Sequence, residues 1–164
     1  MIVREIQPGS AEFAAECALR HRVLREPIGL SLYDEDLEAE KSQLHFGLFD
    51  ADAELVACVI AVATPPSRAK IRQMAVEPRH QGKGLGSFLL ATVEGLLSQR
   101  GLTQLSLHAR IAATGFYEGL GYAAGGTPFL EVGLPHIAMH KRLDEPPTAT
   151  TGPRNPPATR RNAG

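Results

Sequence analysis

The residues best suited to chemistry form a glycine-rich segment, Gln81-Gly82-Lys83-Gly84-Leu85-Gly86-Ser87. This segment follows an apolar run that ends in Met74-Ala75-Val76, and it precedes a long amphipathic stretch. Glycine lacks the Cβ atom that keeps a ligand away from the backbone. Where such a loop enters a helix, free N–H groups and the positive end of the helix dipole favour an anion. The segment therefore predicts a phosphate-binding turn between a strand and a helix.

The spacing of the glycines distinguishes between phosphate-binding motifs. A dinucleotide fingerprint needs Gly-x-Gly-x-x-Gly, but Ser87 stands where the third glycine belongs. A P-loop needs a Gly-Lys-Ser or Gly-Lys-Thr triplet, whereas Gly82-Lys83 is followed by another glycine. The segment does fit the pattern Gln/Arg-x-x-Gly-x-Gly, read from Gln81 to Gly86. A glycine-rich helix entry that binds no ligand is the alternative that these residues alone leave open.

A second block of interest runs from Leu107 to Tyr122. Its residues follow the order Ala-x-x-Phe-Tyr-x-x-x-Gly-Tyr, beginning at Ala113 and including Phe116 and Tyr117. Together with the glycine-rich segment, this block resembles the acetyl-CoA-binding motifs of the GNAT superfamily of N-acetyltransferases. The resemblance covers about residues 1–143 and is strongest over residues 71–122.

Two further features refine this resemblance. Residues 129–136, Phe-Leu-Glu-Val-Gly-Leu-Pro-His, are similar to a segment of one bacterial GNAT subgroup of undefined substrate. The chain also departs from the family pattern, because many members carry Asn three residues before the alanine that Ala113 matches. Here that residue is Arg110, which could contact pantetheine or a phosphate but cannot supply the amide of Asn.

The resemblance implies that acetyl-CoA binds in two parts. Backbone N–H groups from Gly82 to Ser87 would hold the pyrophosphate, with Gln81 and Lys83 beside it. The backbone of residues 74–76 would pair with the pantetheine amides as an extra strand. The cofactor-binding residues expected on this basis are Met74, Ala75, Val76, Gln81, Gly82, Lys83, Gly84, Leu85, Gly86, Ser87, Arg110, Ala113 and Phe116.

The chemistry implied is transfer of an acetyl group to an amine. An alkyl ammonium has a pKa of about 10.4, so a base that removes its proton helps near neutral pH. His136 and Glu131 are the leading candidates for this base, and proton transfer through ordered water is the alternative. Tyr117, whose ordinary pKa is about 10, resembles the general acid that GNAT enzymes place beside the CoA sulfur. No cysteine lies in either block, which favours direct attack over an acyl-enzyme, and no metal motif is present.

Composition limits the class of protein. The chain has 164 residues, of which 43% are hydrophobic, and this suffices for one domain with a packed core. A net charge of −1 argues against nucleic acid as a partner. The absence of a long apolar run and of a signal peptide predicts a cytoplasmic protein with no membrane contact. A GNAT-like domain is expected over residues 1–144 and a flexible tail over residues 145–164, which contain proline and arginine but no large apolar residue.

The hydrophobic pattern predicts the elements that position these residues. Helices are expected from an N-cap at Ser10 to about residue 24, over residues 84–100 and over residues 112–120. Strands are expected over residues 2–6, 45–49, 54–62, 69–76, 105–109, 129–132 and 137–143. This order predicts an α/β (α+β) fold: a mixed, mostly antiparallel sheet of about seven strands flanked by helices, as in a GNAT-like acyl-CoA N-acyltransferase.

The predicted function is acetyl transfer from acetyl-CoA to a primary amine by direct attack in a ternary complex. A non-catalytic acyl-CoA sensor of the same fold is the main alternative. An enzyme that uses a longer acyl-CoA and a mononucleotide-binding domain are the others. The acceptor is expected to be a small-molecule or protein amine, which the acidic residues 34–40 could attract if it is cationic. The resemblance further implies a homodimer.

Overall fold

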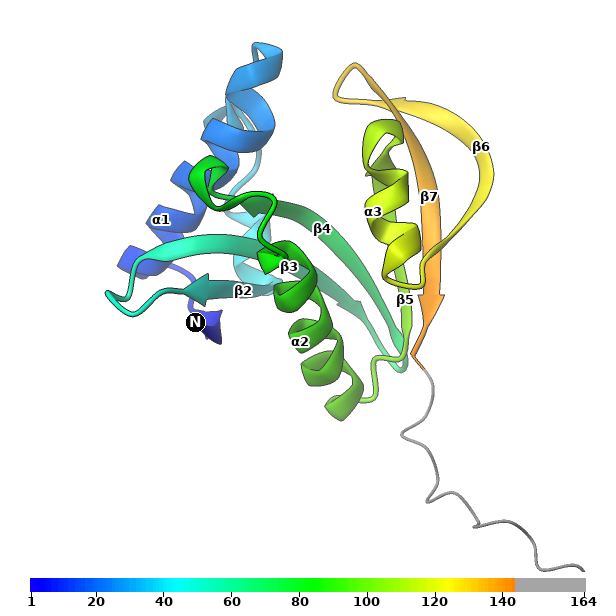
Figure 1. The fold of residues 1–164 in the computed structure, drawn as a ribbon, viewed down its shortest axis with the longest axis horizontal. Helices are drawn as coiled ribbons and strands as arrows, with labels where there is room; N and C mark the ends of the chain where they lie inside the picture. Colours follow the sequence, from blue (N-terminus) through cyan, green and yellow to red (C-terminus); the bar gives the residue numbers. More distant parts are fainter. Residues whose placement is uncertain (144–164) are drawn as a thin grey trace, which may run out of the picture.

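The computed structural model describes residues 1–143, and the predicted tail over residues 145–164 lies outside the described residues. A seven-stranded sheet has the order β1-β2-β3-β4-β5-β7-β6, as Figure 1 shows. All neighbouring strands are antiparallel except β4 and β5, which run parallel. The predicted fold class, a mixed and mostly antiparallel sheet flanked by helices, is thereby confirmed. The strands are β1 (Ile2–Ile6), β2 (Leu44–Phe49), β3 (Leu55–Thr64), β4 (Arg68–Val76), β5 (Gln104–Arg110), β6 (Ala123–Glu131) and β7 (Leu134–Arg142).

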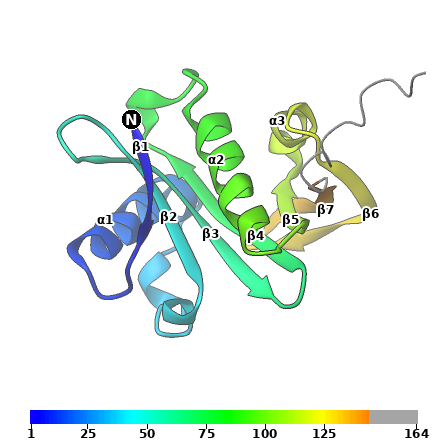
Figure 2. The ribbon, with the colours of Figure 1, turned by 90° about the horizontal axis from the view of Figure 1, so that it is seen from below.

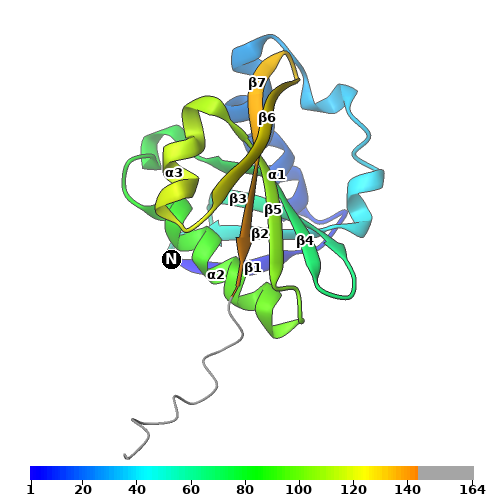
Figure 3. The same ribbon diagram turned by 90° about the vertical axis from the view of Figure 1, so that its right-hand side faces the viewer.

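Within residues 1–143, three α-helices cover the sheet: α1 (Ala11–Arg20), α2 (Leu85–Gln99) and α3 (Thr114–Gly119). Helix α1 lies on one face of the sheet and α2 on the other (Figure 2). The segment between α1 and β2 lies on the side opposite α3, as Figure 3 shows. The predicted N-cap is confirmed, because the hydroxyl of Ser10 accepts a hydrogen bond from the N–H of Phe13 at 3.1 Å.

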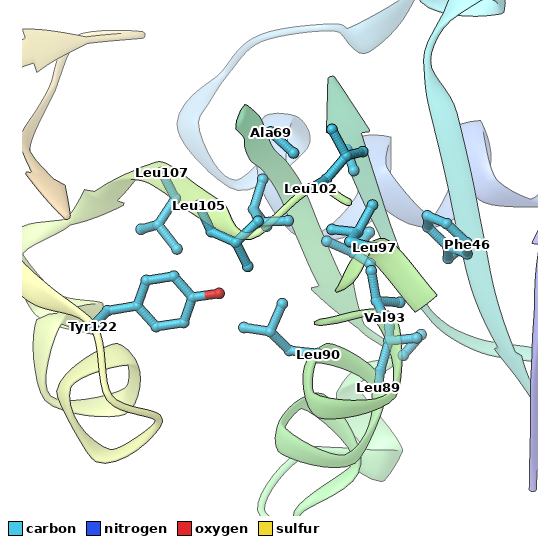
Figure 4. Packing of buried hydrophobic residues seen from close by; sticks show 14 of the residues in the cluster. Phe46, Ala69, Leu89, Leu90, Val93, Leu97, Leu102, Leu105, Leu107 and Tyr122 are labelled. Atoms are coloured by element: carbon cyan, nitrogen blue, oxygen red, sulfur yellow. The ribbon is translucent and has the colours of Figure 1, made fainter. Parts of the chain in front are cut away.

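The main hydrophobic core lies between α2 and the central strands. Leu90, Val93 and Leu97 of α2 are fully buried and lie near Leu105 and Leu107 of β5 (Figure 4). This side of α2 is the apolar face that the helical spacing predicts. Packing on this face fixes the start of α2 relative to the sheet, and the glycine-rich segment immediately precedes that start.

Strands β4 and β5 pair only along their first halves. Residues Arg68–Ile71 match Gln104–Leu107, and no pairing continues beyond Ile71 and Leu107. The two strands diverge from there, with α2 as the crossover between them (Figure 1). The diverging ends leave the second half of β4 without a strand neighbour on its β5 side, and this is where the candidate site forms.

Several boundaries differ from those predicted. Helix α1 ends at Arg20, and a π-helical turn, His21–Arg25, continues it. A 3₁₀ turn, Ile111–Ala113, precedes α3, where the sequence predicts helix from residue 112. Strand β6 begins six residues before the predicted start, at Ala123. Its first half contains Gly125 and Gly126 and has an irregular register, so the apolar alternation that signals a strand is missing there.

Candidate active site

A cavity of about 420 Å³ lies where β4 and β5 diverge. Because the strands separate, side chains from both faces of the sheet reach it. The side bearing α2 and α3 contributes Met74 and Tyr117, which pack against the main core. The lining residues are Leu24, Arg25, Glu35, Lys70, Ile71, Arg72, Gln73, Met74, His108, Arg110, Ala113, Phe116, Tyr117, Glu131, Val132 and His136.

A β-bulge in β4 shapes one wall of this cavity. Cys58 pairs with Ala75 and Ile60 with Arg72, so β4 contains one residue more than β3 between the two pairs. Within the bulge, Gln73 has a φ of +49°, in the left-handed region that side chains other than glycine rarely adopt. The extra residue reverses the side-chain alternation: Ile71 packs with the α2 core, whereas Ala75 packs with Leu19 of α1.

The glycine-rich loop ends in a row of free backbone donors. Gly82 and Gly84 have φ values of +76° and +77°, which glycine adopts without a steric penalty. Among residues 1–143, no backbone carbonyl or side chain accepts a hydrogen bond from the N–H groups of residues 82–87. The N-cap of α2 also lacks a side-chain hydrogen bond. Six consecutive unpaired N–H groups at a helix start suit a bound pyrophosphate, so the residues present fit this part of acetyl-CoA.

Two residues of the loop hold it in place. The side-chain amide of Gln81 donates to the carbonyl of Val76 at 3.0 Å, so it ties the loop to the end of β4. A Cβ atom on Gly86 would lie 3.4 Å from Val76 Cγ2 and 3.5 Å from Phe116 Cζ. A Cβ atom would thus fit at position 86 in ordinary van der Waals contact, whereas a larger side chain would crowd Val76 and Phe116.

Tyr117 extends from α3 into the cavity. Its ring packs edge-on against Phe116 at 5.0 Å and against Tyr122 at 5.9 Å. Burial raises the pKa of Tyr117 to about 12, and the positive charge of Arg110 opposes this only in part. The phenol is therefore neutral and able to donate a proton throughout the physiological range. Tyr122 has a different role, because its hydroxyl donates to Glu94 at 2.8 Å inside the core.

The two predicted base candidates lie side by side in the cavity, together with His108. Glu131 Oε1 lies 2.9 Å from His108 Nδ1, and Glu131 Oε2 lies 3.6 Å from His136 Nε2. His136 donates its Nδ1–H to the carbonyl of Leu134 at 2.8 Å, which leaves Nε2 facing the carboxylate. The two histidines therefore flank one carboxylate.

The same cluster sets the protonation of Glu131. Burial works to raise its pKa, but the hydrogen bond from His108 and the charges of His108, His136 and Lys70 outweigh burial and lower it. Glu131 is thus a carboxylate at neutral pH. A carboxylate with a lowered pKa is a weak base, so it is better suited to orienting an imidazole or an ammonium group than to accepting a proton itself.

Four cations line the cavity, and the sequence analysis singled out only one of them, Arg110. Arg25 forms an ion pair with Glu35 at 2.7 Å. Arg110 donates to the carbonyl of Leu24 at 2.9 Å, and burial together with the nearby charge of Arg25 lowers its pKa. Lys70 and Arg72 complete the set, and their alternation with the buried residues of β4 was the signal that could have identified them.

Other predicted positions lie outside the cavity. Ala75 and Val76 do not line it, and neither does the loop over residues 81–87. Both cysteines are buried, and burial raises the pKa of each thiol, which suits packing rather than nucleophilic chemistry.

The acidic residues 34–40 are divided between paired and exposed carboxylates. Glu35 is paired with Arg25, Glu38 with Lys41 at 2.7 Å, and Glu40 with the fully buried Arg20 at 2.6 Å. Asp36 accepts a hydrogen bond from the N–H of Ala39. Of these residues only Glu35 lines the cavity, where it is already paired with Arg25.

Within residues 1–143, no group of three or more His, Cys, Asp or Glu side chains is placed to bind a metal ion. The same part of the chain contains no helix that is both long and apolar enough to cross a membrane.

Comparison with known proteins identifies the family. Residues 22–143 match the model of the acetyltransferase (GNAT) domain, so the chain belongs to the GNAT family. It is also 33% identical over 75 residues to the uncharacterised protein YyaT of Bacillus subtilis strain 168. This match covers 46% of the chain, and the chain spans about half the length of the curated relatives it matches.

Solved structures share the fold. A Lactobacillus plantarum protein described as an inferred N-acetyltransferase has a TM-score of 0.76 and 27% identity, covering 87% of this chain and 99% of that one. An aminoglycoside 6'-N-acetyltransferase complexed with coenzyme A has a TM-score of 0.72 and 18% identity, covering 87% and 97% of the two chains. Escherichia coli ElaA has a TM-score of 0.73 and 19% identity, covering 87% of this chain and 100% of its own. The second and third likenesses concern the fold alone.

Proposed function

We propose that the protein is an acetyl-CoA-dependent N-acetyltransferase that acetylates a primary amine by direct attack in a ternary complex. The observation that carries this proposal is the combination of a row of free N–H groups at the start of α2 with a cavity lined by Tyr117. The free N–H groups suit a pyrophosphate, and a buried phenol where β4 and β5 diverge suits the role of proton donor.

Each part of the proposed cofactor site has a distinct task. The N–H groups of residues 82–87 hold the pyrophosphate, and Lys83 adds positive charge beside it. Gln81 keeps the loop against β4. The open edge of β4 over residues 74–76 offers backbone groups to the pantetheine amides. Ala113, Phe116 and Arg110 border the far side of the cavity. When bound, acetyl-CoA supplies a thioester, the activated acyl group for transfer.

The remaining residues handle protons. His136 Nε2, oriented by the carbonyl of Leu134 and by Glu131, takes a proton from the ammonium group of the acceptor, directly or through water, so that the neutral amine can attack. Tyr117 gives a proton to the departing sulfur. A phenol with a pKa of about 12 is a weak donor towards a thiolate in water. The burial that raises the pKa of Tyr117 would also raise the pKa of a thiol beside it. The difference between the pKa values of the phenol and the thiol is therefore smaller here than in water.

The first test measures acetyl-CoA binding by isothermal titration. Gly84→Glu places a carboxylate among the free N–H groups and should abolish binding. Gly95→Glu is the matched control, because it adds the same charge to an exposed position of α2 far from the loop. Loss in Gly84→Glu with retention in Gly95→Glu supports the cofactor loop, whereas no binding by the parent contradicts the proposal.

The sensor alternative is distinguished by turnover. If the protein is an enzyme, its Tyr117→Phe variant should bind acetyl-CoA normally but release thiol slowly in the presence of an acceptor amine. In a sensor, neither the parent nor the variant would release thiol above the hydrolysis background, although both would bind acetyl-CoA.

A further inference from the structure

The cavity carries an excess of positive charge. Among residues 1–143, its charged lining comprises the four cations Arg25, Lys70, Arg72 and Arg110, against the two carboxylates Glu35 and Glu131. Charges that line a cavity act through a medium of lower dielectric constant than water, so this imbalance is felt more strongly than at an exposed surface.

Both carboxylates already have partners. Glu35 is held by Arg25, and Glu131 lies between His108 and His136 with Lys70 contributing further positive charge. Among the described residues of this cavity, a polycationic acceptor would therefore meet Glu131 with one ammonium group and find no carboxylate for its other charges. The cavity cations that have no carboxylate partner would also repel such an acceptor.

Lys70 and Arg72 are the cations free to receive an anion. Within residues 1–143, neither has a carboxylate within 4 Å. Arg72 donates from Nη1 to the neutral amide of Gln43 at 2.9 Å, and Lys70 Nζ lies 3.4 Å from His108 Nδ1. Arg72 therefore keeps most of its five donors, and no carboxylate within 4 Å neutralises Lys70.

These two cations are poorly placed to bind the cofactor phosphates. Lys70 pairs with Ser106 where β4 and β5 are still hydrogen-bonded, at the opposite end of β4 from the glycine-rich loop. They also alternate with Ala69 and Ile71, which face the α2 core, so their side chains extend from the other face of the sheet. The proposed phosphate site, in contrast, lies at the start of α2.

We propose that the acceptor is a small amine that also carries a carboxylate, as an amino acid does, and that Lys70 and Arg72 bind this carboxylate. This inference rests on the proposed N-acetyltransferase function. The ammonium group faces Glu131 and His136, and His136 takes one of its protons. The neutral amine forms the C–N bond as the C–S bond of the thioester breaks, and Tyr117 gives a proton to the sulfur. The second proton that the nitrogen loses restores Tyr117, so the products are the N-acetylated acid, free CoA and one proton that passes from His136 to solvent.

The test compares each of several L-amino acids with its own carboxamide, and spermidine serves as a polycation. Thiol release gives kcat and KM, and mass spectrometry confirms the N-acetyl product. The carboxylate member of each pair should have a kcat/KM at least about tenfold higher, the size expected for a charge-assisted hydrogen bond. The amino group of a carboxamide is less basic than that of the matching amino acid, so more of it is unprotonated near neutral pH. Without recognition of the carboxylate, the carboxamide should therefore be the better substrate.

Arg72→Gln and Lys70→Gln should reduce this preference by raising the KM for the acid, with little change for the amide or in the KM for acetyl-CoA. Arg68→Gln is the matched control, because Arg68 is an exposed cation on the same strand that does not line the cavity. A preference that survives in Arg72→Gln and Lys70→Gln, or better turnover of amides or spermidine, would overturn the inference while leaving the proposed function intact.

Saturation-transfer NMR on the CoA-loaded protein covers the case in which no panel member is turned over. Amino acids should give a stronger signal than their amides, and Arg72→Gln should remove the difference. Equal signals, or preferential acetylation of a protein amine, would overturn the inference. Failure of the parent to bind acetyl-CoA would remove the proposed function as well, so the two failures are distinguishable.

Discussion

Replacing Arg20 tests the buried charge network that lies between α1 and the cavity wall. Arg20 is fully buried, and its Nη1 donates to Glu40 at 2.6 Å and to Gln73 at 2.9 Å. Gln73 is the bulge residue that lines the cavity, so Arg20 supports the site without lining it. Behind Arg20, His45 lies 2.9 Å from Glu16, and both of these side chains are also fully buried.

Arg20→Met keeps most of the aliphatic volume but leaves the carboxylate of Glu40 buried without its partner. Breaking a buried ion pair in this way costs about 3–5 kcal/mol, a large part of the 5–15 kcal/mol that stabilises a typical domain. Burial already raises the pKa of Glu40, with Arg20 opposing the shift, so the pKa rises further in the variant. A raised carboxyl pKa makes the folded state bind a proton above pH 4.5, so the penalty is greatest near neutral pH and shrinks as pH falls.

Urea unfolding of the parent, Arg20→Met, Glu40→Gln and the double variant at several pH values measures these free energies. The double variant should recover at least about 2 kcal/mol relative to Arg20→Met, because it no longer buries an unpaired charge. If the double variant is as unstable as Arg20→Met, or if the penalty does not depend on pH, the loss comes from packing and the charge argument is refuted.

Three further outcomes follow from the site. Tyr117→Phe should lower kcat about 10²- to 10⁴-fold with an unchanged acetyl-CoA Kd. In the parent, kcat should not decline through ionisation of Tyr117 below about pH 11. A decline in kcat near pH 10 that is missing in the variant would contradict the raised pKa of about 12. Glu131→Gln should destabilise the protein at pH 7 by less than about 1 kcal/mol, because the site is partly exposed. The difference should shrink below pH 4.5, since a lowered carboxyl pKa stabilises the fold only above it; a constant difference would refute this. Gly86→Val should cost about 1–3 kcal/mol and weaken acetyl-CoA binding, whereas Gly86→Ala, whose Cβ lies 3.4 Å from Val76, should be milder; equal effects in calorimetry would show that the close approach is unimportant.

The sequence was most informative where local rules act alone. The apolar spacing of α2 and the hydroxyl of Ser10 determine where two helices begin, and both starts were predicted to within a residue or two. Glycines 82 and 84 adopt positive φ values, which their lack of a side chain permits. The order of elements and the position of the glycine-rich loop after β4 could therefore be read from the residues.

The charged lining of the cavity could not be predicted in this way. Lys70 and Arg72 appear in the sequence as an ordinary polar face of a strand, and Glu35 appears as part of an acidic run. Only the divergence of β4 from β5 opens a cavity in front of the two cations, and only the folding of the segment after α1 brings Arg25 to neutralise Glu35.

The bulge in β4 is the clearest example of a feature that the local sequence does not predict. Nothing in the local sequence distinguishes Gln73 as a residue with a left-handed backbone, because glutamine has no preference for that conformation. Its conformation accompanies the extra residue in β4 and the hydrogen bond from Arg20, 53 positions earlier in the chain. The sequence by itself thus determined the order of the helices and strands and the place of the glycine-rich turn, since these depend on neighbouring residues. Tertiary packing decided which charges share the cavity, because that depends on strands and side chains distant in sequence.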